Sequence, residues 1–260
     1  MENTLEIKNL SMNFGGLKAV DNLSFSIQEN EIFGLIGPNG AGKTTVFNCI
    51  TQFYRPNEGS ILFNVNGKPV NLVGKPVHNI IKLGLVRTFQ NVEIVRELSL
   101  IDNVLIGAHS HFKATIFEQV FTLPRARREE RLFREKAREA LNFFGIEDRK
   151  DMIAGSQPYG VLKKTELART LMSDPKLIIM DEPAAGLNEA ETEEMAAVIK
   201  DIRDKFNYTI LLIEHDMKFV MGLCDRIVAI SFGQFLNLGT PDVIKNCKIV
   251  QEAYLGEDEA

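Results

Sequence analysis

A short glycine-rich segment carries the residues most capable of chemistry in this sequence. Residues 37–44, GPNGAGKT, satisfy the pattern GxxxxGK[ST] and follow an apolar run at 32–36. In such a loop the glycines turn backbone N–H groups toward a phosphate chain, the lysine bridges its outer oxygens, and the last hydroxyl meets a magnesium ion. The pattern therefore predicts a nucleoside triphosphate site. The residues assigned to it are Gly37, Asn39, Gly40, Ala41, Gly42, Lys43, Thr44 and Thr45, with Thr44 also a ligand of Mg²⁺.

Two neighbouring carboxylates supply a second part of that site. Asp181 and Glu182 follow the apolar run at 177–180, at the carboxyl edge where open α/β sheets bind ligands. We expect Asp181 to support Mg²⁺ and Glu182 to accept a proton from the attacking water. The alternative is that the two acids only cap the following turn. The presence of a phosphate loop in the same chain favours the catalytic interpretation. Together the two motifs predict a P-loop ATPase that takes MgATP.

The elements that must position these residues alternate between strand and helix. The first 65 residues show the period-two alternation of short strands, interrupted by the buried-type run at 32–36. Further buried runs at 177–180, 210–213 and 227–230 are separated by helical segments near 189–205 and 215–223. This alternation predicts a parallel sheet covered on both faces. Residues 100–144 and 161–172 have helical patterns instead, so we predict an α/β core with a helical insertion.

Three more residues complete a resemblance to the ATP-binding cassette (ABC) ATPases that covers essentially the whole chain. Phe14, before Gly15 and Gly16, matches the aromatic that stacks on adenine in that family. Gln90, within RTFQN at 87–91, matches the glutamine that joins the nucleotide site to the helical subdomain, and the resemblance gives it catalytic and metal-binding roles. His215 matches the histidine that contacts the γ-phosphate and is therefore expected to be catalytic.

The resemblance implies a specific architecture. It is a RecA-like P-loop NTPase core with an N-terminal antiparallel β subdomain and an inserted α-helical subdomain, the ABC ATPase fold. On this basis residues 1–91 form the first part of the nucleotide-binding core, residues 92–164 the helical subdomain, and residues 165–260 the second part of the core with a C-terminal tail.

Four segments resemble one branch of the family, the ATPase subunits of branched-chain amino acid importers. They are residues 14–20 (FGGLKAV), 87–90 (RTFQ), 181–188 (DEPAAGLN) and 252–257 (EAYLGE). The branch implies a peripheral subunit on the cytoplasmic face of the inner membrane. Its partners would be two transmembrane permease subunits, a second ABC ATPase subunit and, indirectly, an extracytoplasmic solute-binding protein. The alternatives are a lipopolysaccharide-transport or other ABC ATPase, or an ATP-responsive clamp with little turnover.

One motif departs from the family pattern. The signature LSGGQ, which contacts the γ-phosphate on the other subunit, aligns with residues 157–161, QPYGV. Pro158 supplies neither hydroxyl nor N–H, so the backbone N–H groups near Tyr159 and Gly160 remain as the nucleotide-binding groups. The D-loop aspartate is replaced by Asn188, as in the branch. A heterodimer would carry the altered signature once and a homodimer twice, so we favour a heterodimer.

Composition excludes several other classes. The chain has 260 residues, of which 45% are hydrophobic and 25% charged, as in ordinary globular proteins. A net charge of −5 gives no basic balance, and we expect no nucleic-acid partner. The basic stretch at 125–138 has apolar residues at helical spacing, which favours a solvated amphipathic helix. No apolar run is long enough to span a bilayer.

Overall fold

The computed structural model describes residues 2–88, 93–115, 117–118, 121 and 123–255, and it divides into two compact units. The core unit comprises Met1–Arg87 and Lys176–Ala260, and the helical unit comprises Thr88–Pro175. The sequence placed the second boundary of the insertion at residue 164, which falls inside helix α6 (Tyr159–Leu171). That helix packs on α3 and α5 of the helical unit, so the whole of it belongs there.

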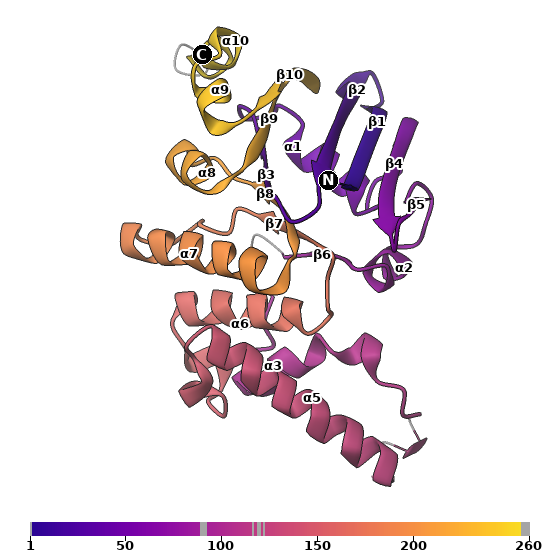
Figure 1. Ribbon diagram of the computed structural model, residues 1–260, viewed down its shortest axis with the longest axis vertical. Coiled ribbons are helices and arrows are strands. Elements are labelled where there is room, and N and C mark those ends of the chain that lie inside the picture. Colours follow the sequence, from indigo (N-terminus) through magenta and orange to yellow (C-terminus); the bar gives the residue numbers. More distant parts are fainter. Residues whose placement is uncertain (1, 89–92, 116, 119–120, 122, 256–260) are drawn as a thin grey trace. The chain divides into compact units, whose positions relative to one another are not determined.

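An antiparallel sheet forms one layer of the core unit, as predicted. It contains β1 (Asn3–Phe14), β2 (Leu17–Gln28), β4 (Glu58–Val65) and β5 (Lys68–Asn71), in the order β2-β1-β4-β5. Figure 1 shows β2, β1 and β4 side by side. The alternating apolar residues face the core: Leu5 pairs with Phe63 and Ile7 with Ile61, and all four side chains are buried.

The second sheet of the core unit is mostly parallel. Its strands are β3 (Ile32–Ile36), β6 (Leu85–Arg87), β7 (Leu177–Asp181), β8 (Thr209–Ile213), β9 (Arg226–Ser231) and β10 (Gln234–Gly239), in the order β10-β9-β3-β8-β7-β6. Only β10 runs antiparallel to its neighbour. Every residue of β3, β7 and β8 is buried, as expected for strands covered on both faces.

Six helices of the core unit accompany the sheets in the described residues. They are α1 (Lys43–Ile50), α2 (Val77–Lys82), α7 (Glu189–Phe206), α8 (Met217–Leu223), α9 (Pro241–Lys245) and α10 (Lys248–Leu255). Helix α1 ends before Gln52, whose left-handed φ of 59° is not compatible with helical backbone. Helix α7 begins where predicted because Asn188 and Glu191 form a reciprocal capping box.

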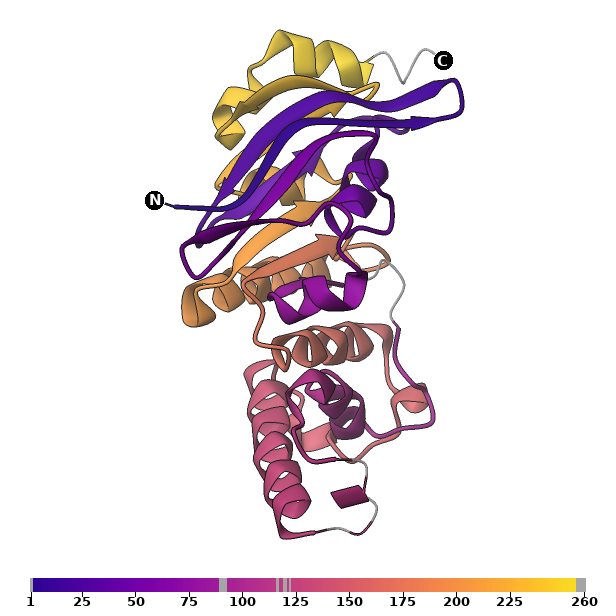
Figure 2. The same ribbon diagram turned by 90° about the vertical axis from the view of Figure 1, so that its right-hand side faces the viewer.

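Three α-helices of the helical unit have bounds within the part of the chain that the structure describes. They are α3 (Leu100–Ile106), α5 (Pro124–Phe143) and α6, with short 3₁₀ turns η1 (His109–His111), η2 (Glu147–Arg149) and η3 (Ala154–Ser156), and Figure 2 shows the three helices packed together. In α5, Phe133, Ala137 and Leu141 are buried at helical spacing, as in the amphipathic helix predicted for 125–138. None of the helices in the described ranges is long and apolar enough to cross a membrane.

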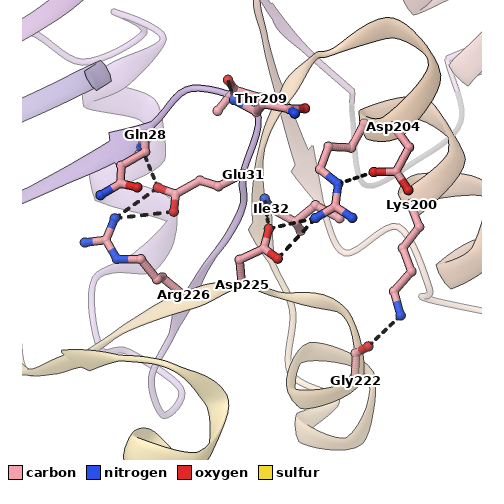
Figure 3. Close-up of polar contacts among 11 residues, drawn as sticks. Gln28, Glu31, Ile32, Lys200, Asp204, Thr209, Gly222, Asp225 and Arg226 are labelled. Carbon is pink, nitrogen blue, oxygen red and sulfur yellow. Dashed lines mark hydrogen bonds and ion pairs between the residues drawn. The ribbon is translucent and has the colours of Figure 1, made fainter. Parts of the chain in front are cut away.

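A network of ion pairs and hydrogen bonds around the buried Glu31 closes the amino edge of the parallel sheet (Figure 3). Glu31, only 6% exposed, accepts hydrogen bonds from the Gln28 amide and from Arg226 Nη1, at 2.5 and 3.1 Å. Asp225 Oδ2 accepts from the Ile32 amide at 2.8 Å and is ion-paired with Arg203. Burial raises the pKa of Glu31, and Arg226 opposes that shift. The network therefore stabilises the start of β3 and β9 by compensating charges that the sheet has desolvated.

Removing one member of this network should destabilise the core unit. In Arg226→Met the Glu31 carboxylate stays buried without its cation, so we expect the free energy of unfolding to fall by about 1.5–3 kcal/mol. The matched control is Lys218→Met, because Lys218 and its partner Glu189 are 79% and 80% exposed and their ion pair is screened by water. Urea unfolding should separate the two variants, and equal midpoints would contradict the stabilising role of the network.

Candidate functional site

The phosphate loop joins the end of β3 to helix α1 through closely packed backbone. A Cβ atom at Gly37 would lie 2.3 Å from the carbonyl oxygen of Ile230. At Gly42, the N-cap of α1, φ is 99° and a Cβ would lie 2.5 Å from the carbonyl oxygen of Ala19. Only glycine fits these two positions without a backbone shift. The loop thus presents the N-terminus of an eight-residue helix at the carboxyl edge of the sheet.

Two backbone carbonyl groups of the phosphate loop hold the side chain of Lys43. Its ammonium group donates to the carbonyl oxygens of Gly37 and Pro38, at 2.5 and 2.9 Å, and the side chain is buried. Residues 39–41 lie between these points, and Thr44 and Thr45 occupy the first turn of α1. The loop therefore concentrates one ammonium group and the N-terminal helix amides where a polyanion would bind.

Arg87 links the phosphate-loop helix to Asp181. Its Nη2 lies 3.2 Å from Asp181 Oδ2, and its Nη1 donates to Asn48 Oδ1 on α1 at 3.1 Å. The guanidinium also lies over the Phe47 ring, 4.0 Å from its centroid. Burial raises the pKa of Asp181, and the positive charge of Arg87 opposes the rise. Asp181 is thus a buried carboxylate aligned with the loop that carries Lys43 and Thr44.

Glu182 and His215 contact each other beside Asp181. His215 Nε2 and Glu182 Oε1 are 2.7 Å apart, and both side chains are partly exposed to solvent. Glu182 has a left-handed φ of 48°, which turns its side chain out of the strand direction, and its amide donates to the Ile213 carbonyl at 2.8 Å. A carboxylate and an imidazole in hydrogen-bond contact at a sheet edge can accept and hold a proton from water.

The strand order explains why these groups converge. Strand β8 lies between β3 and β7, and all three run parallel. Their carboxyl ends lead into the phosphate loop, Asp181 with Glu182, and His215. Three motifs that are spread over residues 37–215 of the sequence therefore meet at one edge. The described residues contain no cluster of three or more His, Cys, Asp or Glu that could bind a metal by itself.

The remaining predicted residues have different surroundings. Phe14 ends β1, is 42% exposed and packs edge to face on Tyr54 at a centroid distance of 5.2 Å. Its ring is therefore accessible for stacking. Tyr159 and Gly160 are the first two residues of α6 in the helical unit. The backbone N–H groups in the first turn of a helix have no acceptor within the helix, so these two can bind a ligand. Gln90 lies outside the described residues.

Two residues of the site were not assigned by the sequence. Arg87 appeared only as part of the RTFQ segment, and Glu214 was not singled out at all. Glu214 is a buried carboxylate, 4% exposed, that accepts hydrogen bonds from backbone amides on both of its oxygens. Glu214 directly follows the buried strand predicted at 210–213, and a charge at that place is a signal that could have identified it; Arg87 lies in β6, a strand that the sequence pattern did not reveal.

Comparison with known proteins identifies the family to which this arrangement belongs. The family model described as "ABC transporter" matches residues 20–185. The chain belongs to the ABC transporter family. Among solved structures, an ATP-binding cassette of an ABC transporter in its ADP conformation superposes on this ABC cassette with a TM-score of 0.84 at 30% identity, covering 98% of this chain and 100% of the other. The ABC ATPase fold, the α/β class and the ATPase activity predicted from the sequence are thereby confirmed.

Curated relatives of this ABC cassette carry more specific names. It is 43% identical over 253 residues to the high-affinity branched-chain amino acid transport ATP-binding protein BraF of Pseudomonas aeruginosa, covering 97% of this chain and 98% of BraF. LivG of Escherichia coli, with the same description, is also 43% identical over 253 residues, with the same coverage of both chains. The lipopolysaccharide export protein LptB of Haemophilus influenzae is 30% identical over 253 residues, covering 97% of each chain.

The backbone of the phosphate loop provides a first test of this site. In Gly42→Ala the added methyl group meets the Ala19 carbonyl, and the left-handed backbone becomes strained by about 1–2 kcal/mol. We expect the affinity for ATP to fall by about 5–30-fold, which is that strain expressed as a binding ratio. Equilibrium binding of a fluorescent ATP analogue measures the change.

Gly222→Ala is the matched control for this substitution. Gly222 lies in α8, and a Cβ atom there meets nothing within 4 Å, so its nucleotide affinity should equal that of the unmodified protein. A folded Gly42→Ala variant with unchanged affinity would show that the loop backbone does not govern nucleotide binding.

Proposed function

We propose that this chain is the ATP-hydrolysing subunit of an importer for branched-chain amino acids. The contact of Glu182 with His215 beside Asp181, at the edge that carries the phosphate loop, supports the hydrolytic step. The transported substrate rests on similarity. The chain is 43% identical to BraF and LivG but 30% identical to LptB, which favours amino acid import over lipopolysaccharide transport.

The residues present fit MgATP. The Phe14 ring would stack on the adenine, while the helix amides and Lys43 would bind the phosphates. Thr44 and Asp181 would hold Mg²⁺ through hydroxyl and carboxylate oxygens, the ligands that this ion prefers, with Gln90 as a further candidate. The buried Asp181 carboxylate beside one arginine fits a site completed by a cation. When bound, Mg²⁺ neutralises charge on the phosphate oxygens.

The chemical step follows from the carboxylate and the imidazole. Glu182 accepts a proton from water as the water oxygen attacks the γ-phosphorus and the bond to the β-phosphate oxygen breaks, which yields ADP and phosphate. His215 donates a hydrogen bond to Glu182 Oε1 and keeps that carboxylate facing the phosphate. Lys43 stabilises the negative charge on the leaving phosphate oxygens.

The partners of this subunit follow from the same proposal. An ATPase subunit of an importer works beside two transmembrane permease subunits and a second ATPase subunit, at the cytoplasmic face of the membrane. A solute-binding protein on the other side would deliver the amino acid to the permeases. We propose the helical unit as the docking surface, with Gln90 at the segment that joins it to the core.

Replacement of the base should separate nucleotide binding from hydrolysis. Glu182→Gln removes the proton acceptor but leaves the phosphate loop unchanged, so hydrolysis at this subunit's own site should fall by about 10²–10⁴ while ATP affinity is retained. Phosphate release by the complex with permeases and partner subunit measures turnover. Wild-type turnover in this variant would show that another group acts as the base.

Lys43→Ala is the complementary control for binding. It removes a positive charge from the β- and γ-phosphates, so the affinity for ATP itself should fall. The fluorescent ATP analogue should then bind weakly to Lys43→Ala and normally to Glu182→Gln. Unchanged binding in both variants would place the nucleotide elsewhere.

We further propose that the working unit is a heterodimer with unequal sites. In the N-cap of α6, Pro158 offers no N–H or hydroxyl, and the Val161 amide is already bonded to the Pro158 carbonyl at 3.0 Å. Only the amides of Tyr159 and Gly160 are then placed to reach a phosphate of the partner subunit. The altered signature of this subunit would face the phosphate loop of the partner, where losing one charge-assisted hydrogen bond should slow hydrolysis by about 10–200-fold. Hydrolysis should therefore be faster at this subunit's own phosphate loop.

Disabling each catalytic glutamate in turn tests this asymmetry. Glu182→Gln should cost most of the turnover of the assembled transporter, and the equivalent change in the second subunit should cost little. Pro158→Ser combined with Val161→Gln should raise turnover at the partner's site. Equal losses from the two glutamate variants, or full activity of this chain as a homodimer, would defeat the proposal.

A further inference from the structure

Glu214 is a buried carboxylate that the mechanism above does not use. It follows the last residue of β8 and precedes His215, and only 4% of its surface is exposed. Burial raises its pKa, the backbone amides of Ala184, His215 and Asp216 oppose this, and the nearby charge of Glu182 adds to the rise. Burying a carboxylate costs free energy unless hydrogen bonds compensate for the lost hydration. Glu214 therefore depends on the backbone amides that it binds.

The two oxygens of Glu214 bind two different loops. Oε1 accepts from the amide of Ala184 at 2.8 Å, and Oε2 accepts from the amide of His215 at 3.1 Å. Ala184 stands two residues after Glu182, in the loop that leads to α7. One side chain therefore joins the loop that carries the proposed base to the loop that carries the histidine.

The backbone of Glu182 needs such support. Its φ of 48° lies in the left-handed region, which is unfavourable for a residue with a side chain, and such a conformation persists only where its surroundings over-determine it. The amide of Glu182 is bonded to the Ile213 carbonyl on one side, and the loop is held again two residues later by Glu214. Hydrogen bonds to Ile213 and Glu214 thus hold the loop of Glu182 and the loop of His215 at the same end of β8.

We propose that Glu214 is a positioning residue for the hydrolytic step. Its carboxylate sets the distance between the Glu182 carboxylate and the His215 imidazole by holding both of their loops. The inference rests on the proposed roles of these two residues and adds a third residue to them. It concerns the reaction rate, because the hydrogen bonds of Glu214 go to the loops that carry Glu182 and His215.

The test is Glu214→Gln in the complex with permeases and partner subunit. The variant keeps the shape of the side chain, but one oxygen becomes an NH₂ group that cannot accept an amide hydrogen bond. We expect kcat to fall by about tenfold or more, as for the loss of a charge-assisted hydrogen bond, while KM for MgATP changes less than about twofold. An unchanged kcat, or a change confined to KM, would overturn the proposal.

A second comparison distinguishes positioning from general destabilisation. Glu31→Gln alters another buried carboxylate, 6% exposed, at the opposite edge of the same sheet. It should lower the unfolding midpoint but leave kcat unchanged. If both variants reduce kcat in proportion to their loss of stability, Glu214 has only a structural role.

A double-mutant cycle identifies the group through which Glu214 acts. In a His215→Ala background the contact that Glu214 positions is already lost, so Glu214→Gln should lower the residual kcat by less than about twofold. Equal fold-losses in both backgrounds would overturn the proposal. If Glu182→Gln retains full turnover, the proposed function itself fails; if Glu182→Gln is inactive and Glu214→Gln is normal, only the positioning role fails.

Discussion

The burial of the parallel sheet on both faces is the constraint on which the rest of the structure depends. Every side chain of β3, β7 and β8 is enclosed, so polar groups can stand only where these strands begin or end. At the amino edge, Glu31 pairs with Arg226 and Asp225 pairs with Arg203, and these ion pairs stabilise the fold. At the carboxyl edge, Asp181 pairs with Arg87, and the partly exposed Glu182 contacts His215. One sheet thus separates its charges into a stabilising edge and a reactive edge.

Close backbone packing provides the precision of the reactive edge. The carbonyl oxygens of Ala19 and Ile230 approach Gly42 and Gly37 so closely that no side chain fits. Arg87 then ties α1 to Asp181 through Asn48, which couples the loop to the end of β7. Because each support comes from a different strand or helix, the geometry of the site depends on the whole core unit.

The fold and most of the core-unit site could be predicted from the sequence, because buried strands and the phosphate loop leave strong local patterns. The run at 32–36 and those at 177–180, 210–213 and 227–230 all proved to be strands. The edge strands β6 and β10 were missed, since a three-residue strand and a partly exposed one lack a clear period. Arg87 and Glu214 act through long-range contacts with Asp181 and Ala184, which no local pattern encodes. The predicted boundary at 164 differs from the division at Pro175 for the same reason, because packing on α3 and α5 groups α6 with the helical unit.

The left-handed backbone of Glu182 has a consequence for how this protein can evolve. Such a conformation costs a residue with a side chain about 1–2 kcal/mol, whereas glycine adopts it freely. Drift toward glycine at this position would therefore relieve the strain but remove the carboxylate. If Glu182 is the base that we propose, its retention is a case of stability given up for activity, which selection must act continuously to maintain.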